Sequence, residues 1–225
     1  MLHRDKRRIG AVCAIAGSAL LVVGTYLHPV PTDPNDAVAA FTEYAADRLW
    51  IASHLMQLAG VTLMLVALIV LAQLQEARAG AVWYSVASGG AIACLAVATA
   101  LQAVDGIALK RIVNVWLTAP IAQKGAAFYA ALAVRQVEVG LASTLSLLLG
   151  LTVTLYGLAM LGDGAFPRWL AGLAVLGGTA TAVSGVVMAY TAFSALEMMI
   201  SMPASWVLLL WIVMTGVWMW RSGEG

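Results

Sequence analysis

Residues Trp50–Leu74 read WIASHLMQLAGVTLMLVALIVLAQL and contain no Asp, Glu, Lys or Arg. A hydrocarbon core about 30 Å thick is crossed by about 20 apolar residues in a helix, and a helix satisfies its own backbone hydrogen bonds there. Five further runs of this kind occur, so the sequence predicts an all-α polytopic membrane protein. The six predicted spans form one bundle with short extracytoplasmic helices and lie at about 9–28, 50–74, 81–104, 136–161, 169–192 and 203–221.

The composition predicts a single transmembrane domain over residues 1–225. The chain of 225 residues is 62% apolar and 10% charged, against about 25% charged residues in a soluble domain. Its net charge is +1 and no basic stripe is present, which argues against nucleic acid as a partner and leaves the lipid bilayer as the expected one.

The charged residues before the first run predict the orientation. Arg4, Lys6, Arg7 and Arg8 form a basic cluster, and basic residues beside a membrane segment tend to stay in the cytoplasm. With six spans, both termini are then expected in the cytoplasm. A cleaved signal peptide is the alternative, but this apolar run exceeds the roughly 7–15 residues of a signal core, so a retained helix is favoured.

Two segments between the spans are predicted to be helical. Asp33, Pro34 and Asp36 form a helix start, with a capping carboxylate and a proline in the first turn. The second segment, 106–117, has an apolar face and a polar face. It suits either a helix in the headgroup layer or a helix that caps the bundle.

The polar face of segment 106–117 carries Lys110 and Arg111. In the headgroup interpretation these cations lie near lipid phosphate. Pro120 and Gly125 are expected to break the helix before the fourth span begins.

Two spans carry a small residue at every fourth position, which lets helix backbones approach closely. We expect these rows to pack inside the bundle, and a homodimer through them is the alternative. The rows are Ala81, Ser85, Gly89 and Ala93 in the third span, and Gly177, Thr181, Gly185 and Ala189 in the fifth.

Polar side chains gather at the predicted outer ends of several spans. Within each helix they recur at spacings of three or four residues and therefore share a face. An ionisable group inside a span costs several kcal/mol unless it is paired or faces water, so the pattern predicts a shared ligand-binding pocket. The predicted ligand-binding residues are His54, Gln57, Gln102, Asp105, Arg135, Glu138, Tyr190 and Glu197.

A metal could occupy the same pocket. His28, His54, Asp105 and Glu138 offer nitrogen and oxygen ligands suited to zinc or iron, although no close motif such as HExxH is present. Haem is less favoured, because His28 lies at a helix end directly before a proline. The structural alternative is that each residue acts locally, with Arg135 and Glu138 forming a salt bridge and Asp105 capping a helix.

Three functions remain open at this point. The first is a receptor, sensor or carrier component that binds a small ligand, such as an amphiphile, or a metal ion. The second is a membrane-embedded enzyme for a lipid-like substrate, with Glu138 or Asp105 as general base and His54 as acid or metal ligand. The third is an accessory or assembly subunit in which the polar residues are structural.

Five short segments together resemble a family of bacterial six-helix integral membrane proteins of unknown function, common in actinobacteria. They are HP at 28–29, WIASHL at 50–55, QAVDG at 102–106, VRQVE at 134–138 and AYTAFSA at 189–195. The resemblance implies a bacterial inner (plasma) membrane protein. It implies no activity, cofactor or catalytic residue.

Overall fold

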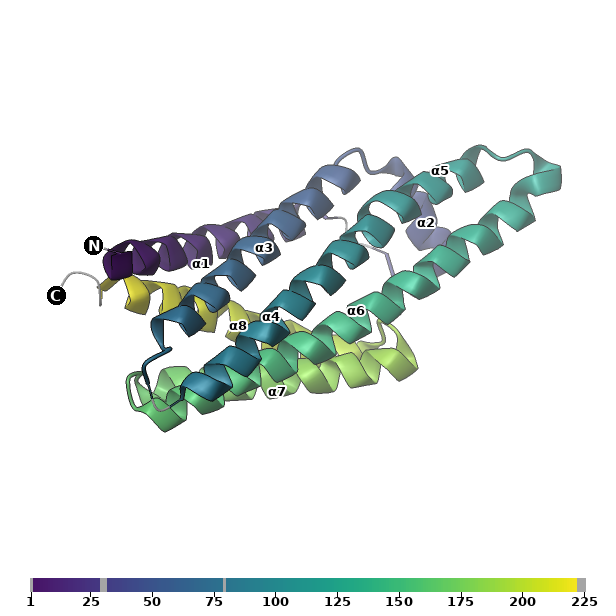
Figure 1. Cartoon of the computed structure of the whole chain (residues 1–225). Helices are drawn as coiled ribbons and strands as arrows, with labels where there is room; N and C mark the ends of the chain where they lie inside the picture. Colours follow the sequence, from purple (N-terminus) through teal and green to yellow (C-terminus); the bar gives the residue numbers. More distant parts are fainter. Residues whose placement is uncertain (1, 29–31, 79, 222–225) are drawn as a thin grey trace.

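The protein is a helical bundle in the computed structural model, which describes residues 2–28, 32–78 and 80–221 (Figure 1). Pro29 lies outside the described residues. The part of the chain that the structure describes forms helices and no strand, and six of the helices are long and apolar enough to cross a membrane. The predicted all-α six-helix fold is therefore confirmed. The six are α1 (Leu2–Tyr26), α3 (Trp50–Leu74), α4 (Ala81–Gln102), α6 (Ile121–Asp163), α7 (Arg168–Thr191) and α8 (Ala195–Arg221).

The six long helices form a closed ring in chain order. Each packs against the next, from α1 through α3, α4, α6 and α7 to α8, and α8 returns to pack against α1. The buried interior includes Leu71, Tyr84, Tyr156 and Trp211. In a bilayer, helices associate by close packing and not by the hydrophobic effect, so tight contacts matter here.

Glycines supply the closest contact, which lies between α6 and α7. A Cβ atom at residue 150 would overlap the backbone nitrogen of Ala182 and lie 2.5 Å from the carbonyl oxygen of Gly178. A Cβ at Gly185 would lie 2.6 Å from the nitrogen of Leu147. The fifth-span row of small residues thus packs inside the bundle at Gly185, as expected.

The third-span row differs from the fifth-span row. Gly89 has no atom within 4 Å of the position its Cβ would take among the described residues. The homodimer alternative for this exposed face stays a prediction.

Gly150→Ala is expected to lower the free energy of unfolding by about 1–3 kcal/mol, because the added methyl meets backbone atoms that cannot move aside. Gly140→Ala is the matched control on α6, since nothing lies within 4 Å of its Cβ position. That variant should be neutral or gain up to about 1 kcal/mol from the better helix former. Unfolding in mixed micelles followed by circular dichroism measures both, and equal stabilities would contradict the close approach of α6 and α7.

Two helices extend well beyond the ring (Figure 1). After α4 the chain continues without a loop through a π-helix, η1 (Ala103–Leu109), into α5 (Lys110–Thr118). The 43 residues of α6 make a rod of about 65 Å, roughly twice a hydrocarbon core. We call α5 with residues 121–138 the hairpin, and we call this end of the bundle the hairpin end. Helix α1 begins and α8 ends at the opposite end (Figure 1).

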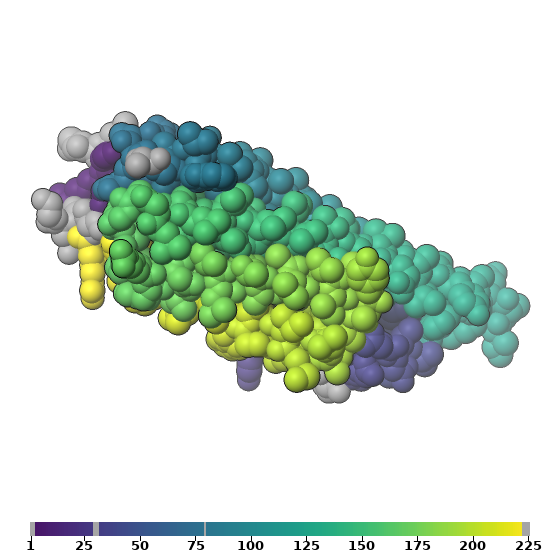
Figure 2. All heavy atoms as spheres, turned by 90° about the horizontal axis from the view of Figure 1, so that it is seen from below, coloured from purple at the N-terminus to yellow at the C-terminus, as the bar shows by residue number. Residues whose placement is uncertain are grey.

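A small aromatic core joins the hairpin to α2 (Ala37–Ala46), the short helix between α1 and α3. The rings of Phe41 and Trp116 lie 6.0 Å apart, and those of Tyr44 and Trp50 lie 4.2 Å apart. The space-filling view places α2 in the corner between the hairpin and the turn from α7 to α8 (Figure 2). As predicted, a short helix follows Asp33, although Asp36 caps it by accepting from the nitrogen of Ala39.

The prediction that Lys110 lies near lipid phosphate is wrong. Its Nζ donates to the carbonyl oxygens of Tyr44 (2.5 Å), Ala45 (2.9 Å) and Asp47 (2.7 Å). These carbonyls end α2, where the helix dipole favours a cation. Lys110 therefore holds α2 against the hairpin, which is closer to the alternative of a helix that caps the bundle.

Two predicted boundaries also change. Gly125 does not break a helix, because α6 begins directly after Pro120 and runs through it. A single glycine costs a helix only about 1 kcal/mol, and packing against α5 offsets it. The last helix begins at Ala195, ahead of the expected 203, and holds Pro203 inside its length.

Candidate functional site

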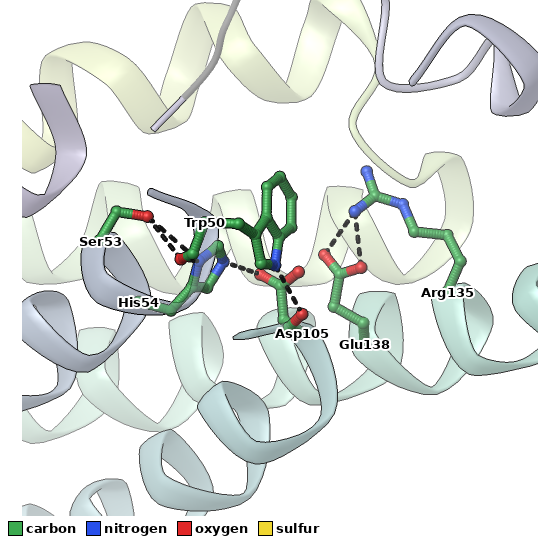
Figure 3. A network of polar contacts seen from close by, with 6 residues as sticks. All are labelled: Trp50, Ser53, His54, Asp105, Arg135 and Glu138. Carbon is green, nitrogen blue, oxygen red and sulfur yellow. Dashed lines mark hydrogen bonds and ion pairs between the residues drawn. The ribbon is translucent and has the colours of Figure 1, made fainter. Parts of the chain in front are cut away.

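Four of the predicted residues meet at the hairpin end. His54 comes from α3, Asp105 from η1, and Arg135 and Glu138 from α6, and their side chains form two ion pairs (Figure 3). In this view Asp105 lies between His54 and Glu138.

His54 is held by both of its ring nitrogens. Nδ1 lies 2.7 Å from the carbonyl oxygen of Trp50, and Nε2 lies 3.0 Å from Oδ2 of Asp105. A carbonyl only accepts, so Nδ1 carries a proton, and Nε2 shares a further proton with the carboxylate. The side chain is 2% exposed. Neither nitrogen is therefore free to bind a metal or to take a proton from a substrate.

The π-helix explains how Asp105 reaches His54. Such segments often occur at functional sites in otherwise regular helices. The indole nitrogen of Trp50 donates to the Asp105 carbonyl at 3.1 Å. The next residue must be small, because a Cβ at Gly106 would lie 2.6 Å from Cβ of His54. Oδ1 of Asp105 is buried and has no hydrogen-bond partner among the described residues.

Arg135 and Glu138 form the second pair, as the structural alternative predicts. Nη1 of Arg135 donates to Oε1 and Oε2 of Glu138 at 2.7 and 2.6 Å. Both residues are buried, with 8% and 3% of their surface exposed. The guanidinium carbon also lies 4.8 Å from the ring centre of Phe193 and 5.7 Å from that of Tyr44. Arg135 is thus a cation flanked by two aromatic rings.

Asp105, Arg135 and Glu138 border a cavity of about 570 Å³, within the roughly 300–1,000 Å³ range of small-molecule sites. The segment before α2 and the α7–α8 turn form one side of it, and Asn35 Nδ2 donates to the carbonyl of Phe193 at 2.9 Å to join them. The lining residues are His28, Thr32, Asp33, Pro34, Asn35, Glu43, Tyr44, Asp105, Arg135, Glu138, Phe193, Ala195 and Met198.

Acidic groups outnumber basic ones in the lining. Four carboxylates face one guanidinium and one imidazole. Among the described residues, Glu43 accepts hydrogen bonds from the backbone nitrogen and the hydroxyl of Thr32. Burial raises the pKa of Tyr44 to about 12, against a smaller opposing effect of Arg135. Its phenol therefore stays neutral at physiological pH.

Phe193 enters the cavity from a strained turn. Ala192, which ends α7, has a φ of 52°, a backbone conformation that costs an L-residue about 1–3 kcal/mol. This backbone conformation turns the chain sharply from α7 to α8. The hydrogen bond from Asn35 to the carbonyl of Phe193, the next residue, helps to hold the turn.

Five predicted ligand-binding residues do not line the cavity, and His54 is one of them, although its partner Asp105 does. Gln57 packs against Gly24 of α1, and Oε1 of Gln102 is buried without a described partner. Tyr190 is 86% exposed. Glu197 is buried and accepts from Ser184 Oγ at 2.7 Å, which joins α8 to α7.

The four candidate metal ligands do not form a ligand shell. The ring of His28 packs at a tilt against the rings of Trp50 and His54, with ring centres 4.7 and 5.0 Å away. Within residues 2–28, 32–78 and 80–221, no three His, Cys, Asp or Glu side chains are placed to hold a metal ion together.

Sequence reasoning missed the part of the lining that lies outside the spans. Asn35, Glu43 and Tyr44 belong to the segment of α2, and Phe193 belongs to the α7–α8 turn. Glu43 does not lie at a helical spacing from any predicted site residue, and Phe193 is apolar, so the pattern of polar residues did not indicate that they line the cavity. The acidic helix start at Asp33 was the one available indication that this segment is structured.

Comparison of the chain with protein-family models, with curated proteins and with solved structures finds no match. The resemblance to the bacterial six-helix family stays a prediction.

Proposed function

We propose that this six-helix membrane protein binds a small polar ligand in the cavity at its hairpin end, as a receptor, sensor or carrier component does. The observation that carries the proposal is the cavity itself, because it is bordered by the buried pair of Arg135 and Glu138 and by Asp105, which His54 of another helix holds in place. Burying ionised side chains is costly. A concave site with apolar walls and a few fixed polar groups is typical of small-molecule recognition.

The arrangement favours binding over catalysis. General acid–base chemistry needs a group that can reach a substrate proton. Both nitrogens of His54 are engaged, and both oxygens of Glu138 accept from Arg135. These contacts hold the charged groups in place. Of the three catalytic candidates, His54, Asp105 and Glu138, Asp105 alone keeps an oxygen without a described hydrogen-bond donor.

The basic cluster in the first turns of α1 supports a location for the cavity. If Arg4, Lys6, Arg7 and Arg8 lie in the cytoplasm, the opposite, hairpin end faces away from it. We therefore place the ligand on the extracytoplasmic side.

A cavity-filling variant tests this function. Ala195 lines the cavity, so Ala195→Phe is expected to fill it and abolish ligand binding. Leu196→Phe is the matched control, because Leu196 is exposed and not among the lining residues. The melting temperature of purified protein is measured against a panel of amines, amino acids, polyols and carboxylates. A ligand at about 100 times its Kd stabilises by about 2.7 kcal/mol.

The expected result is a compound that raises the melting temperature of the wild type and of Leu196→Phe by several degrees, but not that of Ala195→Phe. A panel without effect on the wild type, or an equal shift in all three proteins, contradicts a ligand site in this cavity.

A further inference from the structure

We infer that the ligand is a small organic cation whose ammonium group binds beside Asp105 and Glu138, against the aromatic wall of the cavity. This inference rests on the proposed function and adds the chemical class of the ligand to it.

The first argument is the charge that remains after the internal pairs are formed. His54 pairs with Asp105, and Arg135 pairs with Glu138. Asp33 and Glu43 also line the cavity, and neither has a cationic partner within ion-pair distance among the described residues. The cavity thus keeps an excess of negative charge, which raises the local concentration of cations.

The second argument is the unsatisfied oxygen on Asp105. A buried acceptor without a donor costs about 1–3 kcal/mol, and Oδ1 is such an atom. Asp105 lines the cavity, and this oxygen is enclosed in the structure, so a donor that enters there bonds it once the carboxylate turns toward the cavity. An ammonium group supplies both the N–H donors and the positive charge. An anionic ligand would instead meet four carboxylates and would have to take Arg135 from Glu138.

The third argument is the aromatic wall. The rings of Tyr44 and Phe193 already flank the guanidinium of Arg135 at 5.7 and 4.8 Å, and such faces attract alkylammonium groups in the same way. Met198 and Ala195 add apolar contacts for carbon. These walls suit an ammonium that carries carbon substituents, and they do not suit a hydrated metal ion.

A substituted ammonium could come from two sources. One is a free amine in solution, and the other is the headgroup of an aminophospholipid, because the cavity lies at the end of the membrane-spanning helices. Both present the same ammonium on a short carbon chain. Titrations in bilayers with and without the aminophospholipid separate them.

Calorimetric titration of the full-length protein compares two cations with neutral molecules of similar shape. Choline is paired with 3,3-dimethylbutan-1-ol, and ethanolamine is paired with ethylene glycol. At least one cation is expected to bind tenfold or more tightly than its neutral counterpart. Glycerol phosphate, an anion, is expected not to bind.

Two variants in one segment provide the matched control. Asp33→Asn removes a cavity carboxylate and is expected to weaken cation binding at least threefold. Asp36→Asn removes the same charge three residues later, outside the lining, and asparagine caps the helix equally well, so its affinity should equal that of the wild type. Asp105→Asn should weaken cation binding tenfold or more. If Asp105→Asn does not fold, the comparison of Asp33→Asn with Asp36→Asn still tests the inference.

The lipid arm repeats the ethanolamine titration in nanodiscs of phosphatidylethanolamine and of phosphatidylglycerol. Tenfold weaker apparent binding in phosphatidylethanolamine identifies the headgroup as the occupant, and equal binding identifies a free amine. Neutral molecules or glycerol phosphate that bind as tightly as the cations overturn the inference and leave the proposed function standing. The cation inference is also overturned if no probe binds and the lipid composition has no effect. The proposed function is decided separately, by the melting temperatures of Ala195→Phe and Leu196→Phe.

Discussion

Glu138→Ala is expected to lower the free energy of unfolding by about 3–5 kcal/mol, because it leaves the buried guanidinium of Arg135 without its anionic partner. Arg135 is 8% exposed and donates through Nη1 to both oxygens of Glu138. The neighbouring rings of Phe193 and Tyr44 attract the cation but do not neutralise it. Unfolding by SDS in mixed micelles, followed by circular dichroism, measures the loss.

The matched control replaces both partners. In the double variant Arg135→Met and Glu138→Met no charge is left unpaired, so most of the lost stability should return. A single Glu138→Ala variant within about 0.5 kcal/mol of the wild type would mean that water reaches Arg135 freely and that the pair is a surface one.

Lys110→Met is expected to cost about 3 kcal/mol, since it removes three charge-assisted hydrogen bonds while leaving helix-end carbonyls that water can partly satisfy. The loss should concentrate on α2, whose last carbonyls Lys110 binds. Hydrogen exchange measures it directly. The amides of residues 37–46 should exchange at least tenfold faster in the variant, while those of α7 keep their protection.

Arg111→Met is the matched control for Lys110. Arg111 is the next residue along α5, and it is exposed, so its loss should change stability by less than about 0.5 kcal/mol. Equal exchange of α2 in both variants would show that the aromatic core, and not the ammonium of Lys110, holds α2 in place.

The six spans were predictable because the bilayer imposes one requirement, a length of apolar helix, and each run meets it. The meeting of His54, Asp105 and Glu138 was also predictable, since a charged group within a span must find a partner. The same rule correctly paired Arg135 with Glu138, three residues along one helix face.

The misplaced residues share a different cause. Lys110 was read from the amphipathic pattern of its own helix, but its partners are carbonyls at the end of α2 in another part of the chain. Glu197 lies at a spacing and depth that suited the predicted pocket, yet its carboxylate accepts a hydrogen bond from Ser184 of the preceding helix. Periodicity gives the face on which a side chain lies. It does not give which neighbour covers that face.

The π-helix between α4 and α5 has a consequence for how the bundle is put together. A π-helix takes more residues for each turn than an α-helix. Residues 103–109 therefore shift the direction in which all later side chains of the rod point around the helix axis. One unbroken rod can therefore present two apolar stripes with different phases, one directed at α3 and α6 and the other at α2 and α6. Asp105 sits where the two phases meet, so the helical offset that orients the hairpin also aims this carboxylate at His54.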